Sequence, residues 1–380
     1  MREEPVTAVV TANDAFAADL YGVLTGDTRQ TVFSPVSVAA ALRMALCGAR
    51  GQSAAELGGA LHESPDAAAD GLRATSAAVH DVAADGSVTF RAPSIVWVQS
   101  GLPLRPEFTG QLGDAAAAAI ARVGFAEAPE AARAEINRVI AEQTAGKITG
   151  LLPAPAISDL TQLVHTSAIY LKAAWAERFA EAATRDAPFY PDGPDRPSLT
   201  VPMMHSTAAR AYRHGDRYQA VLLPYQGGQL AMAVVLPDGP LTTLRPAIAA
   251  DGLRGLLAGT SRYQVTLSLP RFRVEAAFDL IPVLRRLGVN QAFTREADFS
   301  GITEAERLLI NAVAHKAYVD VDEQGTEAAA ATAISFRPTA AFQAPPAVTM
   351  TVDRPFLFVI FHTPTGMPLF VGQVSRPGVR

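Results

Sequence analysis

The 380-residue sequence is poor in cysteine and lysine, and each shortage excludes a class of protein. A single cysteine, Cys47, cannot form an internal disulfide, and its apolar helical surroundings favour a buried structural thiol over a reactive one. Lysine occurs only at Lys147, Lys172 and Lys316, the arginines are scattered, and the net charge is -5. Because nucleic acids and anionic membranes bind concentrated basic surfaces, we expect neither as the main partner.

Long apolar runs and catalytic motifs are also missing. No stretch approaches the roughly 20 apolar residues of a membrane-spanning helix, and the N-terminal segment lacks the apolar core of a signal peptide. The sequence has no glycine-rich phosphate loop, paired cysteines, H-E-x-x-H or G-x-S-x-G, and its seven histidines lie far apart. We therefore expect a soluble protein that is not an enzyme and has no cofactor or metal. Its compartment, secreted or cytoplasmic, stays open.

Helices are predicted mainly in the first half of the chain. Ser34 before Pro35 predicts an N-cap and a first-turn proline, and Ser53 with Glu56 predicts a capping box for the next helix. The alanine-rich segment 114–121 is interpreted as a helix because alanine has the highest helix propensity. Apolar periodicity predicts two further helices, over 136–143 and 279–287.

Strands are predicted mainly in the second half. Residues 263–269 alternate between apolar and polar, which is typical of a half-buried strand, whereas 230–237 is continuously apolar and should be covered on both faces. Two apolar runs, 355–361 and 368–374, flank a turn-rich segment and predict a buried hairpin. Since no repeat or low-complexity linker marks a boundary, we expect one mixed α+β domain over residues 1–380.

The segment 321–350, VDEQGTEAAAATAISFRPTAAFQAPPAVTM, has few side chains that can pack. Its alanines are compatible with a helix, but the segment is equally compatible with a latent strand. With a period of two, one face of such a strand is small and uncharged, and the other tolerates water. A strand of this kind could enter between two existing strands. The small face carries Thr326, Ala328, Ala330, Thr332 and Ile334, and the other carries Glu327, Ala329, Ala331, Ala333 and Ser335.

Several stretches, in order along nearly the whole chain, resemble the serpin family. They include VFSPVSVAAAL, INRVIAEQTAGKITGLLP, LPRFRVEAAFDLIPVLRRLGV, AVAHKAYVDVDEQGTEA and DRPFLFVIFHTPTGMPLFVGQVSRP. The resemblance implies a serpin fold with a large central mixed β-sheet, two further sheets, eight or nine helices and an exposed reactive-centre loop over residues 323–348. It also implies a prokaryotic, metastable suicide-substrate inhibitor of serine proteases, in which the cleaved loop inserts into the central sheet and traps the acyl-enzyme.

The resemblance also assigns the hinge of the loop and its reactive bond. Counting the family's usual spacing from Glu323 places the cut between Thr339 and Ala340, whereas counting back from the segment RPF gives positions near Ala341 or Ala344. The hinge count is preferred because that half of the loop must span the sheet. The small hinge side chains favour an inhibitor. The hinge residues are Gly325, Thr326, Glu327, Ala328, Ala329, Ala330 and Ala331.

The residues around the cut indicate the class of protease. A small residue at the cut suggests an elastase-like or subtilisin-like serine protease. Cleavage at Phe342 would suggest a chymotrypsin-like one. Arg337 would suit a trypsin-like protease, but the proline that follows it usually blocks such cleavage.

Other matched positions are structural in the family. Ser34, Ser37 and His315 align with the shutter, a buried polar cluster beneath the opening sheet, and Ser167 stands where the family often has asparagine. Trp175 matches the tryptophan at the top of the sheet, called the breach, and Glu323 with Arg271 matches an ion pair near the point of loop entry. For that pair the alternative is an ordinary surface pair worth less than about 1 kcal/mol.

The remaining expectations concern partners. The segment 79–87 is acidic where heparin-binding serpins carry a basic helix, so we expect no glycosaminoglycan partner. We expect a monomer. The alternative function is that of a non-inhibitory serpin, a binding or folding protein.

Overall fold

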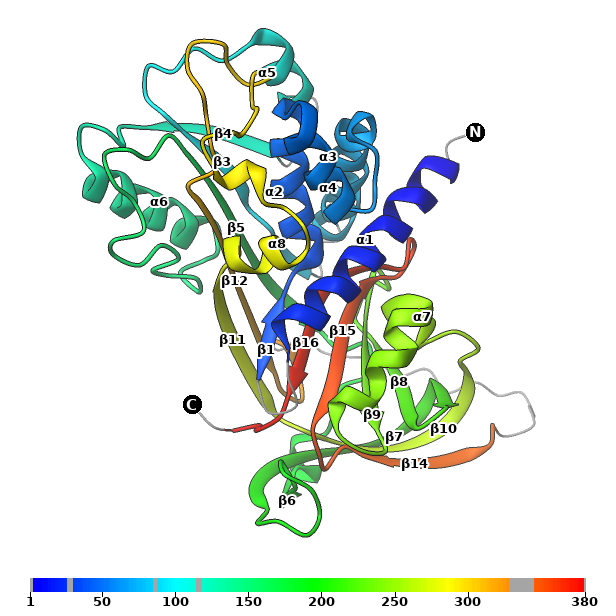
Figure 1. The fold of residues 1–380 in the computed structure, drawn as a ribbon. Coiled ribbons are helices and arrows are strands. Elements are labelled where there is room, and N and C mark those ends of the chain that lie inside the picture. Colours follow the sequence, from blue (N-terminus) through cyan, green and yellow to red (C-terminus); the bar gives the residue numbers. More distant parts are fainter. Residues whose placement is uncertain (1–2, 26–29, 85–87, 114–117, 328–344, 379–380) are drawn as a thin grey trace.

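The computed structural model describes residues 3–25, 30–84, 88–113, 118–327 and 345–378 (Figure 1). Within these ranges none of the helices is both long and apolar enough to cross a bilayer. The α-helices of the described part are α1 (Glu3–Leu24), α2 (Pro35–Gly48), α3 (Gly51–Ala60), α4 (Ala68–Ala84), α5 (Pro106–Gly113), α6 (Pro129–Gln143), α7 (Arg245–Gly255) and α8 (Ile281–Arg286).

Within the described residues, a mixed seven-stranded sheet, the central sheet, has the order β11-β12-β13-β5-β3-β4, with β2 beside β5. β3 runs parallel to β4 and β12 parallel to β5, while β11 with β12 and β3 with β5 are antiparallel. Its strands are β2 (Val88–Arg91), β3 (Ser94–Gln99), β4 (Ala118–Val123), β5 (Leu163–Ala174), β11 (Phe272–Asp279), β12 (Ala312–Val321) and β13 (Gly325–Thr326).

The other strands form a nine-stranded sheet of order β1-β16-β15-β9-β8-β7-β10-β14, with β6 beside β7. The 17-residue β7 pairs with β8 at its C-terminal end and with β10 along much of its length, so the two further sheets expected are joined into one hydrogen-bonded network. The strands are β1 (Thr31–Phe33), β6 (Arg185–Phe189), β7 (Leu199–Gly215), β8 (Tyr218–Pro224), β9 (Leu230–Pro237), β10 (Ser261–Pro270), β14 (Ala347–Thr351), β15 (Phe356–His362) and β16 (Met367–Val374).

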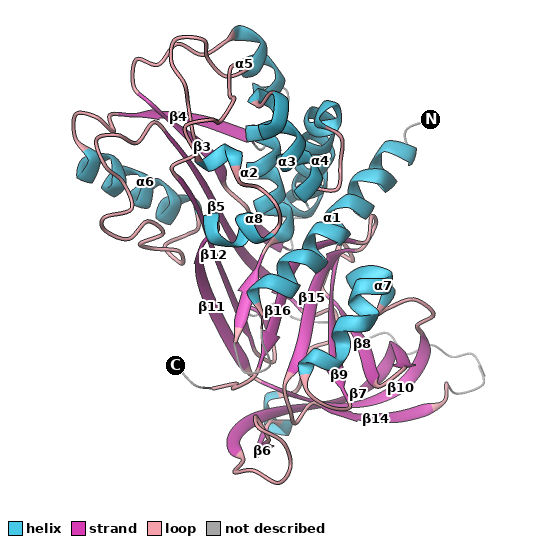
Figure 2. Ribbon diagram, in the orientation of Figure 1, coloured by secondary structure: helices cyan, strands magenta, loops and turns pink. Residues whose placement is uncertain are grey.

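The central sheet is covered on both faces, as Figure 2 shows. On one face α6 packs Ile136 and Ile140 into a core that includes Trp97 and Val164. On the other face α2, which contacts β3, β5 and β16, is buried along nearly its whole length. Both surfaces of β5 are therefore apolar environments, which explains why almost every residue of this strand is buried.

Several predicted elements are confirmed. Ser34 caps α2 by accepting the Ser37 N–H, with Pro35 in the first turn. β9 is buried as expected of a strand covered on both faces, and β15 and β16 form the predicted hairpin. The fourth predicted helix is shorter than expected. It begins at Ile281, whose N–H is accepted by Asp279.

The predicted capping box was wrong. α3 begins at Gly51, and its N-cap residue Arg50 makes no side-chain capping bond among the described residues. Gly51 has a φ of 53°, which allows the chain to turn into the helix three residues earlier than predicted. Ser53 instead accepts the Asp298 N–H, and Glu56 accepts backbone N–H groups at positions 290 and 291.

The helix predicted over 114–121 was also wrong. Residues 118–123 form β4, which pairs with β3, and residues 114–117 lie outside the described part of the chain. Ile120 packs against the core formed with α2, whereas Ala121 packs against the core under α6. This alternation across the sheet is that of a strand, so tertiary pairing overrides the helix propensity of alanine.

Candidate functional site: the hinge and the shutter

The hinge enters the central sheet where β5 and β12 separate. The two strands pair directly from Ala312–Val164 to Tyr318–Tyr170. Beyond that point β13 lies between them, with Thr326 opposite Ala173 on β5 and Val321 on β12. The described chain ends at residue 327 and resumes at 345, and β14 begins at Ala347. The other predicted hinge residues and the reactive bond lie outside the described residues, namely Ala328, Ala329, Ala330, Ala331, Thr339 and Ala340.

Gly325 and Thr326 are suited to this position. Gly325 has a φ of 149°, and a Cβ on it would lie 2.1 Å from the Ala173 carbonyl oxygen. Only glycine allows the chain to approach β5 this closely. Thr326 is fully buried, and its hydroxyl lies 2.7 Å from that of Tyr225. The first two hinge residues are therefore already strand residues of the sheet.

Glu327 follows Thr326 and lies on the opposite face of the central sheet, beside Lys147. Its φ is 48°, a left-handed conformation that non-glycine residues seldom adopt. The carboxylate contacts the Lys147 ammonium at 2.9 Å, and only 9% of the side chain is exposed. Lys147, which follows α6, covers the Glu327 side chain on this face.

Trp175 joins the end of β5 to the segment that enters the hinge. Its indole N–H donates to the Asp322 carbonyl at 2.9 Å, and its backbone N–H donates to the Gln324 carbonyl at 2.9 Å. The buried ring stacks on Tyr225 with 4.5 Å between centroids. Because Tyr225 also contacts Thr326, the aromatic pair packs directly against the hinge.

Glu323 and Arg271 form the predicted ion pair, with 2.7 Å between the guanidinium and the carboxylate. The Glu323 side chain is 3% exposed and that of Arg271 is 45% exposed. Burial alone would raise the pKa of the Glu323 carboxyl, but hydrogen bonds from Arg271 and Thr184 outweigh it and lower that pKa. With one partner buried, this pair differs from an ordinary surface pair.

One buried hydrogen-bond network connects the four residues predicted to form the shutter. The His315 ring accepts the Ser34 N–H at Nε2, 2.9 Å away, and its Nδ1 lies 2.8 Å from the Ser167 hydroxyl. Since Nε2 is an acceptor, Nδ1 carries the proton and donates it to Ser167. The Ser34 hydroxyl donates to that of Ser37 at 3.0 Å. Burial lowers the pKa of His315 to about 3, so the ring is neutral.

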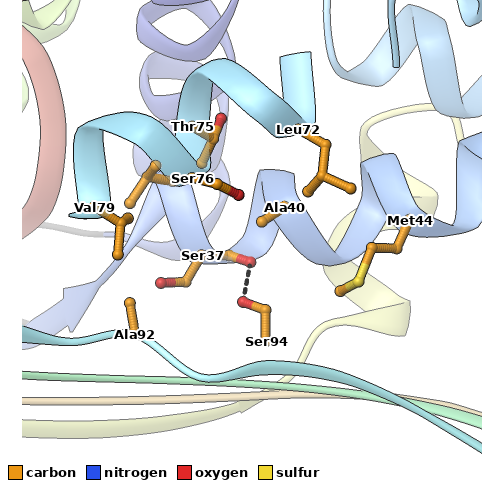
Figure 3. A pocket seen from close by; sticks show the side chains of 10 residues that line it. Ser37, Ala40, Met44, Leu72, Thr75, Ser76, Val79, Ala92 and Ser94 are labelled. Carbon is orange, nitrogen blue, oxygen red and sulfur yellow. Dashed lines mark hydrogen bonds between the residues drawn. The ribbon is translucent and has the colours of Figure 1, made fainter. Parts of the chain in front are cut away.

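A small cavity lies beside the shutter, between α2, α4 and the start of β3 (Figure 3). The Ser94 hydroxyl donates to the Ser37 carbonyl at 3.3 Å along its lower edge. The Ser76 hydroxyl is buried at its wall and has no hydrogen-bond partner among the described residues. The enclosed space of about 10 Å³ has room for no more than a single water molecule. The cavity is therefore a local packing gap.

His165 is a buried residue that the sequence analysis missed. It lies two positions before Ser167 on β5, is 2% exposed, and neither ring nitrogen has a hydrogen-bond partner within the described ranges. Burial lowers its pKa to about 4. The available signal was a histidine inside the apolar run LVHTSAIYL. Buried polar groups without partners destabilise the state that buries them.

The central sheet, its α6 and α2 layers and the hinge between β5 and β12 define a serpin fold. The model of the family described as Serpin (serine protease inhibitor) matches residues 11–377. The chain belongs to the serpin family. Serpins are in general protease inhibitors rather than enzymes.

Individual relatives agree with this assignment. An uncharacterized serpin-like protein of Thermococcus kodakarensis is 37% identical, with 99% of this chain and 88% of that protein covered. The leukocyte elastase inhibitor of Bos taurus is 36% identical, with 96% of this chain and 98% of the inhibitor covered. Among solved structures, human thyroxine-binding globulin complexed with its hormone superposes with a TM-score of 0.85 at 26% identity, covering 98% of this chain and 99% of that one.

Proposed function

We propose that the protein is a suicide-substrate inhibitor of serine proteases whose cleaved loop inserts as a new strand between β5 and β12. The observation that carries the proposal is β13. Gly325 and Thr326 already occupy the place where that strand would begin, paired with β5 on one side and β12 on the other. The leukocyte elastase inhibitor relative supports an inhibitory role.

The existing pairing predicts where each later loop residue would lie. Thr326 is opposite Ala173 and Val321, and an antiparallel strand moves one residue back along both neighbours at each step. Thr332 would then lie between Ser167 and His315, in place of their hydrogen bond. Phe336 would lie opposite Leu163, the first residue of β5, so pairing of the inserted strand with β5 would end there.

The small-residue face would fit the space beneath the sheet. Residues with even numbers would share the face of Thr326, so Ala328 and Ala330 would lie beside buried apolar residues such as Leu171 and Ile169. The Thr332 hydroxyl would reach the two polar shutter groups that insertion separates. Large or charged residues at these positions would oppose entry.

The energy of insertion comes from new strand pairing. An inserted residue makes hydrogen bonds to both neighbours while β5 and β12 lose their direct bonds, which leaves a gain of roughly one bond per residue. With roughly ten further residues at about 1 kcal/mol each, insertion would release on the order of 10 kcal/mol. The uncut molecule is then a kinetically trapped state.

The reactive bond and the target protease are part of the proposal. A cut between Thr339 and Ala340 lies a short distance beyond the predicted end of the inserted strand and would suit an elastase-like or subtilisin-like protease. A cut between Ala341 and Phe342 would suit the same class, because a small residue again precedes the bond, whereas a cut after Phe342 would suit a chymotrypsin-like protease. Mass spectrometry of the peptide released during inhibition identifies the bond.

Incubation with elastase, subtilisin and chymotrypsin tests the proposal. We expect at least one of them to form a complex that survives boiling in detergent. The Ala328→Arg variant should give cleaved protein without complex, because a guanidinium would have to enter the buried face of the sheet. Cleavage of the unaltered protein without any stable complex would contradict inhibition.

A non-inhibitory binding role is the second candidate, favoured by the similarity to thyroxine-binding globulin. Such a protein would yield only cleaved product in the same experiment. Under either function we expect one domain spanning residues 1–380. We also expect a monomer without a glycosaminoglycan partner. Size-exclusion chromatography with and without heparin tests the oligomeric state and the binding of heparin.

A further inference from the structure

Glu327 is the last described residue before the loop, and its backbone is held in an unfavourable conformation. Its N–H still donates to the Asp320 carbonyl of β12 at 3.1 Å, yet its φ is 48°. A non-glycine residue keeps a positive φ only when surrounding contacts compensate for it. The contacts of the Glu327 side chain supply that compensation.

Three side chains surround the Glu327 carboxylate. Lys147, from the segment after α6, contacts it at 2.9 Å and also lies 5.8 Å from the centre of the Tyr318 ring. Tyr170 on β5 and Tyr318 on β12 are both buried. Burial raises the pKa of each phenol, and the nearby Glu327 carboxylate raises that of Tyr170 further. For Tyr318, the Asp320 carboxylate, which accepts the phenol proton at 3.0 Å, adds more to the rise in pKa than Glu327 does.

The two tyrosines are neighbours only while the sheet is closed. Tyr170 and Tyr318 are directly opposite each other at the upper end of the β5–β12 pairing. By the pairing of Thr326, Ala329 would enter between them during insertion. Adjacent strands are about 4.8 Å apart, so an intervening strand would double the distance between the two tyrosine positions and remove the shared carboxylate site.

We propose that Glu327, Lys147, Tyr170 and Tyr318 form a latch that holds the hinge at Thr326 and slows further insertion. The latch binds the carboxylate in the closed sheet and not in the expanded one, so it stabilises the uncut state selectively. It also connects the hinge to the segment after α6, which covers the face of the sheet that must move. This inference rests on the proposed insertion mechanism.

Hydrogen exchange of the uncut protein tests the latch without any protease. In Lys147→Met and in Glu327→Gln, we expect the amides of 312–318 and 164–170 to exchange about three to ten times faster than in the unaltered protein. The double variant should exchange no faster than the faster single variant, because both substitutions break one contact. The rate at which uncut protein converts spontaneously to a heat-resistant form should follow the same order. Both single variants should convert faster than the unaltered protein, and the double variant no faster than the faster single variant.

The matched control is Glu142→Gln on α6. Glu142 forms an ion pair with Arg138 at 2.6 Å and is 62% exposed, so its loss should leave exchange in β5 and β12 unchanged. Rates at or below those of the unaltered protein in both latch variants would overturn the latch. A cut protein that gains no heat resistance would instead overturn insertion, and the two failures are therefore distinguishable.

Discussion

His315 on β12 accepts the backbone N–H of Ser34, the N-cap residue of α2, at 2.9 Å. The same ring donates to Ser167 on β5. One neutral imidazole thus connects two strands of the central sheet to the helix that packs beneath them. Separation of β5 from β12 must break the bond to Ser167 but can keep the bond to Ser34.

The first prediction concerns Ser167→Ala. It leaves the His315 Nδ1–H buried without a partner, so we expect the uncut protein to lose about 1–3 kcal/mol of unfolding free energy. The loss should be smaller after loop cleavage, because Thr332 would then lie beside His315. Urea denaturation of both forms measures the difference. Thr207→Ala, which removes an exposed hydroxyl pair with Thr266, is the control and should have little effect.

The second prediction concerns acid sensitivity. The pKa of His165 is lowered to about 4, whereas in the unfolded chain it is about 6.5. The unfolded state therefore binds the proton first, and stability present above pH 6.5 is lost as the pH falls toward 4, by about 1.4 kcal/mol per pH unit.

His165→Leu should remove that part of the pH dependence. At pH 7 the variant should be as stable as the unaltered protein or more so, because two buried nitrogens without partners are replaced by apolar atoms. Denaturant midpoints at pH 5 and pH 7 check this. An unchanged slope with pH would mean that His165 is solvated or bonded in solution.

The third prediction concerns the ion pair at loop entry. Arg271→Ala leaves the Glu323 carboxylate buried with Thr184 as its side-chain hydrogen-bond partner among the described residues, so we expect a loss of about 2–3 kcal/mol of unfolding free energy, more than for an exposed pair. The control is Arg138→Ala on α6, which removes exposed pairs with Glu135 and Glu142 and should lower the unfolding free energy less than Arg271→Ala does. Equal losses in the two variants would show that Glu323 is hydrated.

The fourth prediction concerns the cut molecule. A single cleavage of the loop C-terminal to Phe336 should raise the melting temperature by on the order of 10 °C or more, since insertion adds on the order of 10 kcal/mol to a chain of this length. Differential scanning calorimetry before and after limited proteolysis gives the comparison. Equal melting temperatures would argue against a trapped uncut state.

Local sequence signals predicted the elements that depend on near neighbours. Ser34 and Pro35 predicted the start of α2, and apolar runs predicted β9 and the β15–β16 hairpin. These local signals failed where pairing with another strand decides the secondary structure. Residues 118–123 are alanine-rich and become a strand because β3 supplies a partner.

The hinge likewise has some features that could be predicted from the sequence and others that could not. The position of the hinge and the ion pair between Glu323 and Arg271 were predicted from resemblance to the family, and the described part of the chain has Gly325 and Thr326 in the sheet. The Lys147 contact could not be predicted, because it joins residues 180 positions apart. Nor does a sequence indicate whether the nitrogens of a buried histidine such as His165 find partners.

The position of Thr326 in the central sheet would affect the rate of the proposed loop insertion. Four identical alanines follow the neighbouring glutamate, and a free strand of such residues could pair in several shifted alignments. In the proposed mechanism, a strand anchored at Thr326 would need no search for its alignment and no nucleation event, because Gly325 and Thr326 are already paired in the sheet. An inhibitor whose loop must insert before the bound protease completes its reaction would gain time, because the first residues of the new strand are already in place.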